Sequence, residues 1–368
     1  MQIIIYMDDS KSDESKLKDI ANKICTKKYD KNFINSKCLK ELSIILHDNP
    51  EISKDKLNEY GICDKLQKIK TLFVFNINDA LFHPLILQNL CNVKNLTISS
   101  DGKYCQTLSN IDFLQSFTKL KRLAIHHVSL MDSNSLSPIA NLTNLKSLDI
   151  QDCQIEDLSP IASMKSLTHI RCNSNNIQEF PLMPYVKKLI AYDNPLNNID
   201  SLKQAKNLEY LSISRCNLND ISSLANLTKL HSIYCVRNKI SDISFITNLS
   251  QLKTFIADDN NISSLAIYSS HTNLKTLSLR NNKITNIHNI TNCPNLTFLS
   301  LDKNQIIDIE PISQLYKLKH LQLSRNLIDD IEPINNLRNL YTLDVSKNPR
   351  LIITNTNVGF NNIKSLRY

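Results

Sequence analysis

The chain has 368 residues, of which 42% are apolar, 21% charged and 6% aromatic, a composition that excludes wholesale disorder. The formal net charge of +8 is modest for this length, so a dedicated nucleic-acid binder, which usually concentrates far more positive charge, is not expected. Only three glycines occur, Gly61, Gly102 and Gly359; they cannot build a glycine-rich phosphate loop or a dinucleotide fingerprint, which excludes most nucleotide-dependent enzymes.

Residues 1–65 are expected to form a small helical region. Apolar residues recur there at helical spacing behind a polar start, namely Leu17, Ile20, Ala21, Ile24 and Cys25. Residues 54–60 predict a second helix, ended by Gly61. Residues 39–44 weakly match the repeat pattern that is described below, and they are a candidate for one additional, degenerate repeat. We expect residues 1–65 to cap the array that follows, with a separate partner-binding helix as the alternative.

The cellular compartment of the protein is predicted from its cysteines and from the lack of long apolar segments. No stretch approaches 18 apolar residues, so no membrane span is expected. The start of the chain does not have the pattern of a secretory leader. The ten cysteines include no C-x-x-C spacing, and several fall where the repeat needs a small buried residue. We therefore expect reduced thiols and a cytoplasmic protein.

From residue 69 onward one pattern recurs. It reads L-x-x-L-x-L-x-x-N-x-I-x-x-I-x-x-I, and we number its positions from the first apolar residue, so that the asparagine is position 9. Eight repeats begin 22 residues apart, at Val186, Leu208, Leu230, Leu252, Leu274, Leu296, Leu318 and Leu340. Five less regular ones precede them, at Ile69, Val93, Leu120, Leu145 and Leu167. Thirteen repeats are predicted in all.

The pattern also predicts the local structure of each repeat. The L-x-L segment alternates with the period of a strand, which points its leucines to one side and their neighbours to the other. A column of asparagines indicates a shared hydrogen-bonded turn, because a buried amide needs partners. The I-x-x-I-x-x-I spacing suits a short 3₁₀ segment on the outer side, and Pro160, Pro311 and Pro333 fit its first turn.

These repeats resemble those of the leucine-rich repeat family, in its 22-residue class. The D-x-x-P-I tails, such as residues 157–161 and 308–312, are similar to those of internalins and of protein phosphatase 1 regulatory subunits. The resemblance covers residues 69–351. It implies an α/β fold, a right-handed solenoid with a curved parallel sheet on its concave face and 3₁₀ or irregular segments on its convex face. The expected domains are residues 1–65 as N-terminal cap, 66–351 as solenoid and 352–368 as C-terminal cap.

The sequence predicts no catalytic residue, no metal site and no cofactor. The nine histidines are scattered without a metal-binding spacing, and no G-x-S-x-G occurs. His126 and His127 are adjacent and so point to opposite sides of a strand; His169 and Cys172, three residues apart, do the same, which argues against a Cys–His dyad. A metal or redox cluster is the alternative reading for four cysteines on repeat positions, Cys153, Cys172, Cys216 and Cys235.

Two candidate binding surfaces follow from the repeat register. The first is an apolar and aromatic patch with two arginines beside it, which has the composition of an interface hot spot. Its members are Ile190, Tyr192, Tyr210, Arg215, Tyr234, Val236, Arg237 and Ile256. The second is a basic edge made of Arg280, Lys303, Arg325 and Lys347, interrupted by Asp302 and Asp344.

The sequence favours a monomeric, non-enzymatic scaffold that binds a protein partner on its concave face. The three tyrosines would anchor the partner, and Arg215 and Arg237 would supply charge-assisted hydrogen bonds. The resemblance to phosphatase regulatory subunits makes a phosphatase one candidate partner. Two alternatives remain open, a surface-displayed, internalin-like adhesion protein and a weak binder of nucleic acid or another anionic ligand along the basic edge.

Overall fold

The structure is a computed structural model that describes residues 13–23, 33–50, 52–75, 83–100, 106–108, 110–130, 136–352 and 363–368. The chain forms two compact units. The N-terminal unit contains residues 1–155 and 164–167, and the C-terminal unit contains residues 156–163 and 168–368. This division into two units does not test the domain boundaries predicted after residues 65 and 351, which stay predictions.

The N-terminal unit begins with helices around a short strand. Their bounds are α1 Asp13–Lys23, β1 Phe33–Asn35, α2 Ser36–Asp48, α3 Lys54–Glu59, α4 Ile62–Gln67 and α5 Pro84–Asn89. The two helices predicted in residues 1–65 are confirmed as α1 and α3, although Ile24 and Cys25 lie outside the described residues. The degenerate repeat at residues 39–44 is wrong, because that segment lies inside α2 and buries Leu39 and Leu42.

Parallel strands continue the N-terminal unit. They are β2 Thr71–Phe75, β3 Asn95–Ser99, β5 Arg122–His126 and β7 Ser147–Gln151, and β1 joins their edge by pairing with β2. A second pair consists of β4 Gln106–Thr107 and β6 Val128–Ser129. The outer side carries η2 Asp112–Ser116 and α6 Ser137–Ala140. Helix α2 packs against α1 on one side and against β1 and β2 on the other, so it covers the first strands.

The C-terminal unit is a regular array in which every repeat supplies one short parallel strand. The strands are β8 His169–Arg171, β9 Lys188–Ile190, β10 Tyr210–Ser212, β11 Ser232–Tyr234, β12 Thr254–Ile256, β13 Thr276–Ser278, β14 Phe298–Ser300, β15 His320–Gln322, β16 Thr342–Asp344 and β17 Ser365–Arg367. Each pairs in register with the next. Residues 353–362 of the predicted C-terminal cap lie outside the described residues.

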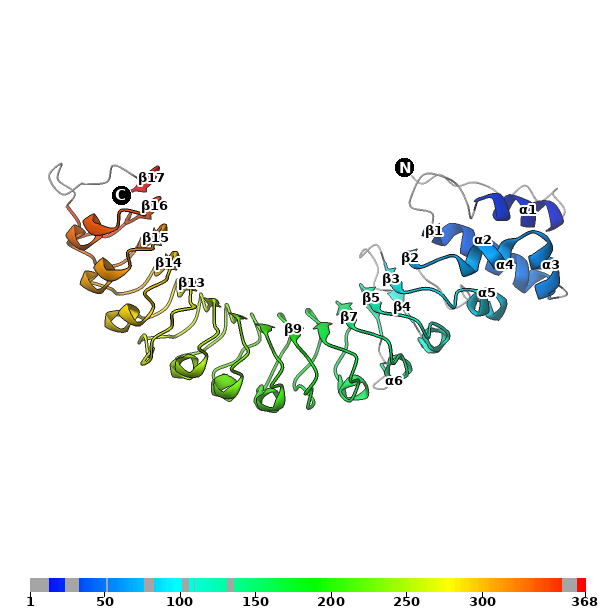
Figure 1. Cartoon of the computed structure of the whole chain (residues 1–368), viewed down its shortest axis with the longest axis horizontal. Coiled ribbons are helices and arrows are strands. Elements are labelled where there is room, and N and C mark those ends of the chain that lie inside the picture. Colours follow the sequence, from blue (N-terminus) through cyan, green and yellow to red (C-terminus); the bar gives the residue numbers. More distant parts are fainter. Residues whose placement is uncertain are drawn as a thin grey trace. The chain divides into compact units, whose positions relative to one another are not determined.

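The predicted 3₁₀ segments return the chain on the outer side of this array (Figure 1). They are η3 Ser159–Ile161, η4 Asp200–Gln204, η5 Ser222–Asn226, η6 Ser244–Asn248, η7 His288–Asn292, η8 Glu310–Gln314 and η9 Glu332–Asn336. Pro160, Pro311 and Pro333 occupy first-turn positions as predicted. A strand inside and a 3₁₀ segment outside give the C-terminal unit a parallel sheet on its concave face, which is the predicted solenoid architecture.

The asparagines at position 9 form the predicted shared turn. In Asn304, Nδ2 donates to the carbonyls of Leu301 and of Leu279 in the preceding repeat, while Oδ1 accepts from the backbone N–H of Ile284. The same pattern is made by Asn194, Asn238, Asn260, Asn282, Asn326 and Asn348. Each asparagine thus joins two repeats and fixes their register.

Candidate partner-binding surface

The inner face of the C-terminal unit consists of rows of side chains that follow from the repeat register. Positions 3, 5 and 7 point away from the core, because the residues at positions 4 and 6 are buried. Parallel strands about 4.8 Å apart bring equivalent positions of successive repeats into contact. Among the predicted patch residues, Tyr210 stands at position 3, Ile190, Tyr234 and Ile256 at position 5, and Tyr192 and Val236 at position 7.

Tyr210 and Tyr234 form the centre of the patch. Their ring centroids lie 5.3 Å apart with the planes tilted by 33°, a separation at which aromatic rings attract each other. Lys188, at position 3 of β9, places its ammonium 4.6 Å from the centroid of the Tyr210 ring. Burial and the neighbouring Tyr234 both raise the pKa of Tyr210. Both rings are half-buried, so each keeps a surface that a partner can cover.

Ile190 differs from the other patch residues, because it is only 8% exposed. It pairs in register with Arg171 on β8 and with Ser212 on β10. The strands on both sides of β9 therefore flank this side chain, and its exposure is that of a core residue. The prediction that Ile190 is an exposed contact residue is therefore wrong. Tyr192, Val236 and Ile256 are half-buried and complete the apolar surface.

The two arginines predicted beside the patch are already paired with acidic neighbours. The Nη1 atom of Arg215 lies 3.5 Å from Oδ2 of Asp193, and Nε of Arg237 lies 3.4 Å from Oδ2 of Asp259. Both arginine side chains remain more than half exposed, at 53% and 58%. Exposed pairs of this kind contribute little to stability, so these guanidinium groups can exchange a neighbouring carboxylate for one on a partner.

A left-handed turn determines where these charged residues lie. The residue at position 8 has a positive φ, between 54° and 60°, in eight successive repeats: Asp193, Arg215, Arg237, Asp259, Asn281, Lys303, Arg325 and Lys347. This turn follows the strand and precedes the buried asparagine. Three members of the predicted basic edge, Lys303, Arg325 and Lys347, belong to this column. The fourth member, Arg280, lies outside this column, because it stands at position 7 and Asn281 occupies position 8 of that repeat.

The acidic residues that interrupt the basic edge serve the backbone. Oδ1 of Asp302 accepts hydrogen bonds from the backbone N–H and from the hydroxyl of Ser324, at 2.8 Å each. Oδ1 of Asp344 likewise accepts from the backbone N–H and the hydroxyl of Ser346. Asp258, at position 7 like Asp302, accepts from Arg280 N–H and Ser278 Oγ, and burial raises the pKa of this carboxyl. These carboxylates satisfy N–H groups beyond the strand ends, which gives them a structural role.

The paired histidine and cysteine candidates of the sequence stand apart in the part of the chain that the structure describes. Within the residues the structure describes, no group of three or more His, Cys, Asp or Glu side chains could hold a metal ion. Cys216, in the asparagine column, donates its thiol to the carbonyl of Ala191 in place of an amide, and burial raises its pKa to about 12. A thiol held protonated in this way is a poor nucleophile. His169 is exposed and Cys172 buried, which agrees with their predicted separation.

Comparison with known proteins agrees with the geometry. A family model described as leucine rich repeats (2 copies) matches residues 143–182 and 272–314. An internalin, InlF of Listeria monocytogenes, is 26% identical, with a TM-score of 0.61 over 81% of this chain and 93% of the internalin. The chain is a leucine-rich repeat protein that resembles internalins.

Other leucine-rich repeat structures share the fold. A leucine-rich repeat protein of Leptospira interrogans is 20% identical, with a TM-score of 0.58 over 78% of this chain and 86% of that one. The plant peptide hormone receptor RGFR1, solved in complex with RGF2, is 18% identical, with a TM-score of 0.63 over 82% of this chain and 55% of the receptor. No curated protein is similar enough in sequence to be counted as a relative.

Sequence reasoning about this leucine-rich repeat protein missed one contributor to the patch. Lys188 precedes Ile190 by two residues and therefore points to the same side of the sheet, but it was not counted among the patch residues. The alternation that identified Ile190 and Tyr192 was sufficient to find it. None of the helices in the described residues has the length and apolar character needed to span a membrane.

Proposed function

We propose that this protein is a non-enzymatic binding module whose C-terminal unit holds a protein partner on its concave face. Tyr192, Tyr210 and Tyr234 are the anchors, with Val236 and Ile256 as apolar surroundings. The observation that carries the proposal is the half-buried pair of Tyr210 and Tyr234, whose tilted rings lie in contact on a parallel sheet. Aromatic side chains fixed in this way lose little conformational entropy on binding, and they dominate measured interface energies.

The charged rim supports a protein as the occupant. Arg215 and Arg237 stand beside the aromatic patch in exposed ion pairs, an arrangement of apolar centre and polar rim that is typical of protein interfaces. The plant receptor with a similar fold was solved in complex with RGF2, which supports a binding role for the fold. The comparisons do not favour a phosphatase, so the proposal names no enzyme as the partner.

The proposed location is the cytoplasm, because five cysteines of the described part of the chain are free thiols, Cys63, Cys91, Cys216, Cys235 and Cys293. The similarity to an internalin favours one alternative, adhesion at a cell surface. Labelling the thiols of freshly isolated native and unfolded protein separates the two. Cysteines that label on unfolding without a reductant support the cytoplasm, and cysteines that label only after reduction support export.

The concave-face proposal is tested by affinity capture from native lysate of the source cells. The bait is the wild-type chain or the Tyr210→Ala/Tyr234→Ala variant. The matched control is Tyr268→Ala/Tyr316→Ala, which removes two tyrosines that are 68% and 61% exposed and belong to the outer segments. We expect the partner to be lost with the first variant and retained with the control. Equal recovery with wild type and the first variant would overturn the proposal.

A further inference from the structure

Lysines occupy the same repeat position on consecutive strands of the N-terminal unit. Position 2 is Lys70, Lys94, Lys121 and Lys146 in four successive repeats. The backbone N–H of Lys94 donates to the carbonyl of Lys70 (2.8 Å), Lys121 to Lys94 (2.8 Å), and Lys146 to Lys121 (2.9 Å). Because this ladder joins neighbouring strands directly, the four lysines stand at the beginnings of successive strands, at intervals of about 4.8 Å.

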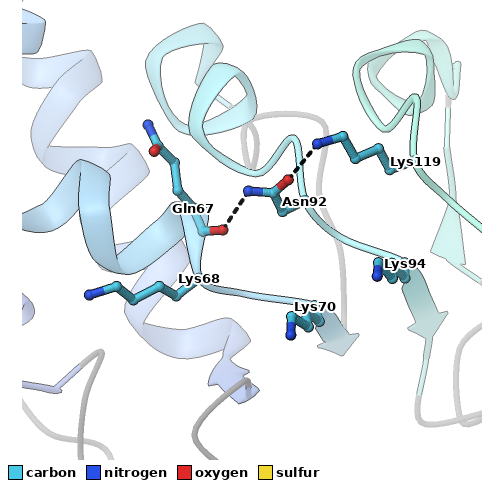
Figure 2. Close-up of a pocket in the computed structure, with 6 residues that line it drawn as sticks. All are labelled: Gln67, Lys68, Lys70, Asn92, Lys94 and Lys119. Carbon is cyan, nitrogen blue, oxygen red and sulfur yellow. Dashed lines mark hydrogen bonds between the residues drawn. The ribbon is translucent and has the colours of Figure 1, made fainter.

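A hollow of about 460 Å³ opens beside the first two of these lysines. Its lining consists of Gln67, Lys68, Lys70, Asn92, Lys94 and Lys119, and Figure 2 shows Lys70 and Lys94 side by side at the starts of their strands. Lys119 Nζ donates to Asn92 Oδ1 (2.8 Å), and Asn92 Nδ2 donates to the carbonyl of Gln67 (2.8 Å). These bonds fix one ammonium at the rim before any ligand arrives.

The hollow contains positive charge without a counter-charge. No carboxylate lines it, and Lys68, Lys70 and Lys94 are exposed and form no ion pair with any residue that the structure describes. At the first such lysine of the C-terminal unit the column is interrupted, because Glu209 follows Lys187 and pairs with it at 3.7 Å. Lys253 and Lys275 again stand next to each other further along that unit. Adjacent like charges repel, so Lys68, Lys70 and Lys94 around the hollow favour an anion between them.

We propose that this hollow, which we call the lysine hollow, binds a compact ligand that carries clustered phosphate groups. Its volume lies in the range of small-molecule sites. Ammonium groups bind phosphate as point charges. The four lysines that line the hollow therefore suit a ligand with several phosphates close together. None of the lining residues is aromatic, so the hollow has no surface on which a base would stack. The phosphates can belong to a free molecule or to a lipid headgroup. The site is independent of the concave face proposed above.

The test measures binding of inorganic tripolyphosphate to the full chain by calorimetry at physiological salt. The variant is Lys70→Gln/Lys94→Gln, and the matched control is Lys253→Gln/Lys275→Gln. The control removes the same charge from the same repeat position on two adjacent strands of the C-terminal unit, where Lys275 N–H donates to the Lys253 carbonyl. We expect the first variant to weaken binding by about tenfold or more and the control by less than about twofold. All three proteins should melt at nearly the same temperature, because the substituted side chains are exposed.

Lipid vesicles and single-stranded RNA are two further probes. The vesicles distinguish a lipid headgroup from a free phosphate ligand, and the RNA tests whether the hollow is specific for clustered phosphates. Phosphatidylcholine vesicles that contain phosphatidylinositol bisphosphate are compared with vesicles that contain phosphatidylserine at equal surface charge. Binding selective for the bisphosphate and lost in Lys70→Gln/Lys94→Gln identifies a headgroup; its absence, with tripolyphosphate still bound, identifies a free ligand. The proposal is overturned if tripolyphosphate does not bind, if both lysine variants weaken binding equally, or if single-stranded RNA binds as tightly per phosphate as tripolyphosphate.

Discussion

The side-chain amide of Asn304 donates a hydrogen bond to the carbonyl oxygen of Leu279, 25 residues earlier in the chain, at 3.0 Å. The same side chain accepts from Ile284 and donates to Leu301, so one buried group serves backbone atoms of two repeats. Repetition of this arrangement keeps the strands in register, and register is what brings Tyr210 next to Tyr234. The candidate binding surface therefore depends on a set of side chains that never reach it.

Replacing Asn304 should be costly although no apolar contact is lost. Asn304→Ala leaves the N–H of Ile284 buried without its partner, and such a group costs about 1–3 kcal/mol. The carbonyls of Leu279 and Leu301 each lose one of two hydrogen bonds, because Asn282 and Asn326 supply the other. We expect the free energy of unfolding in urea to fall by about 1–3 kcal/mol. Asn335→Ala, at an exposed position of η9, is the control and should change it by less than about 0.5 kcal/mol. A similar small effect of both substitutions would show that the asparagine column does not stabilise the array.

Much of this architecture was predictable because its causes are local and repeated. Alternation at positions 4 and 6 identified the strands, and Pro311 and Pro333 identified 3₁₀ segments, since each signal recurs at one spacing. The outer segment of the Leu252 repeat departs from the rule: residues 262–273 contain no helix, and Ser264 instead forms an isolated bridge with Asn286. The missing helix could not be predicted from the sequence, because an irregularity that occurs in one repeat produces no periodic pattern.

The candidate site was predictable only in part, because exposure depends on neighbours that the register alone does not describe. Ile190 points to the inner face as expected, yet it is only 8% exposed between its neighbours on β8 and β10. Arg215 lies beside the patch as expected, yet its pairing with Asp193 depends on side-chain reach. The lysine hollow was missed because position 2 was not compared along the repeats, although the sequence held that signal.

Truncation of a core leucine gives a second test of the repeat register. Leu299 is fully buried at position 4 of the Leu296 repeat, whereas Ile307 is 45% exposed at position 12. Leu299→Ala should lower the free energy of unfolding by about 2–5 kcal/mol through the cavity it leaves. Ile307→Ala should lower it by less than about 1 kcal/mol. Equal losses measured by chemical denaturation would contradict the assignment of core and surface.

The stacked tyrosines should affect binding far more than stability. Tyr210→Ala and Tyr234→Ala each remove a half-buried ring, so each should cost about 1 kcal/mol of folding free energy. A double-mutant cycle should give a coupling of about 0.5–1.5 kcal/mol between the two rings. A coupling near zero would mean that the rings are not stacked in solution. A large drop in melting temperature for either single variant would mean that they belong to the core.

The buried thiols predict a loss of stability in alkaline solution. Burial raises the pKa of Cys293 to about 12 and raises that of Cys235 strongly as well. Above about pH 9 an unfolded thiol ionises while the folded one stays protonated, so the unfolded state binds fewer protons and stability falls as pH rises. Each such thiol should cost about 1 kcal/mol between about pH 9 and 10.

Cys235→Ala tests this prediction with little disturbance, since alanine occupies the same repeat position at Ala191 and Ala257. The variant should lose stability less steeply than wild type between about pH 9 and 11, as measured by urea denaturation at each pH. Parallel curves for the two proteins would show that the Cys235 thiol does not contribute to the alkaline transition.

A buried histidine predicts the opposite dependence in acid. His271 is 1% exposed, and within the described residues neither ring nitrogen has a partner at hydrogen-bond geometry, although the Thr247 backbone lies near enough to oppose the fall of its pKa in part. It occupies position 20, where other repeats have Leu249, Leu315 and Leu337. Burial lowers its pKa below the usual 6.5, so below that pH the unfolded state binds a proton that the folded state does not, and stability falls as pH falls.

His271→Leu should therefore stabilise the protein at every pH, because it replaces an unpartnered polar ring with the apolar side chain of the other repeats. The gain should be about 1–2 kcal/mol at neutral pH and should increase as the pH is lowered from about 7 to 5. His288→Leu, which changes an exposed histidine in η7, is the control and should show neither effect. A gain that stays constant with pH would show that His271 takes up its proton as easily in the folded chain as in the unfolded one.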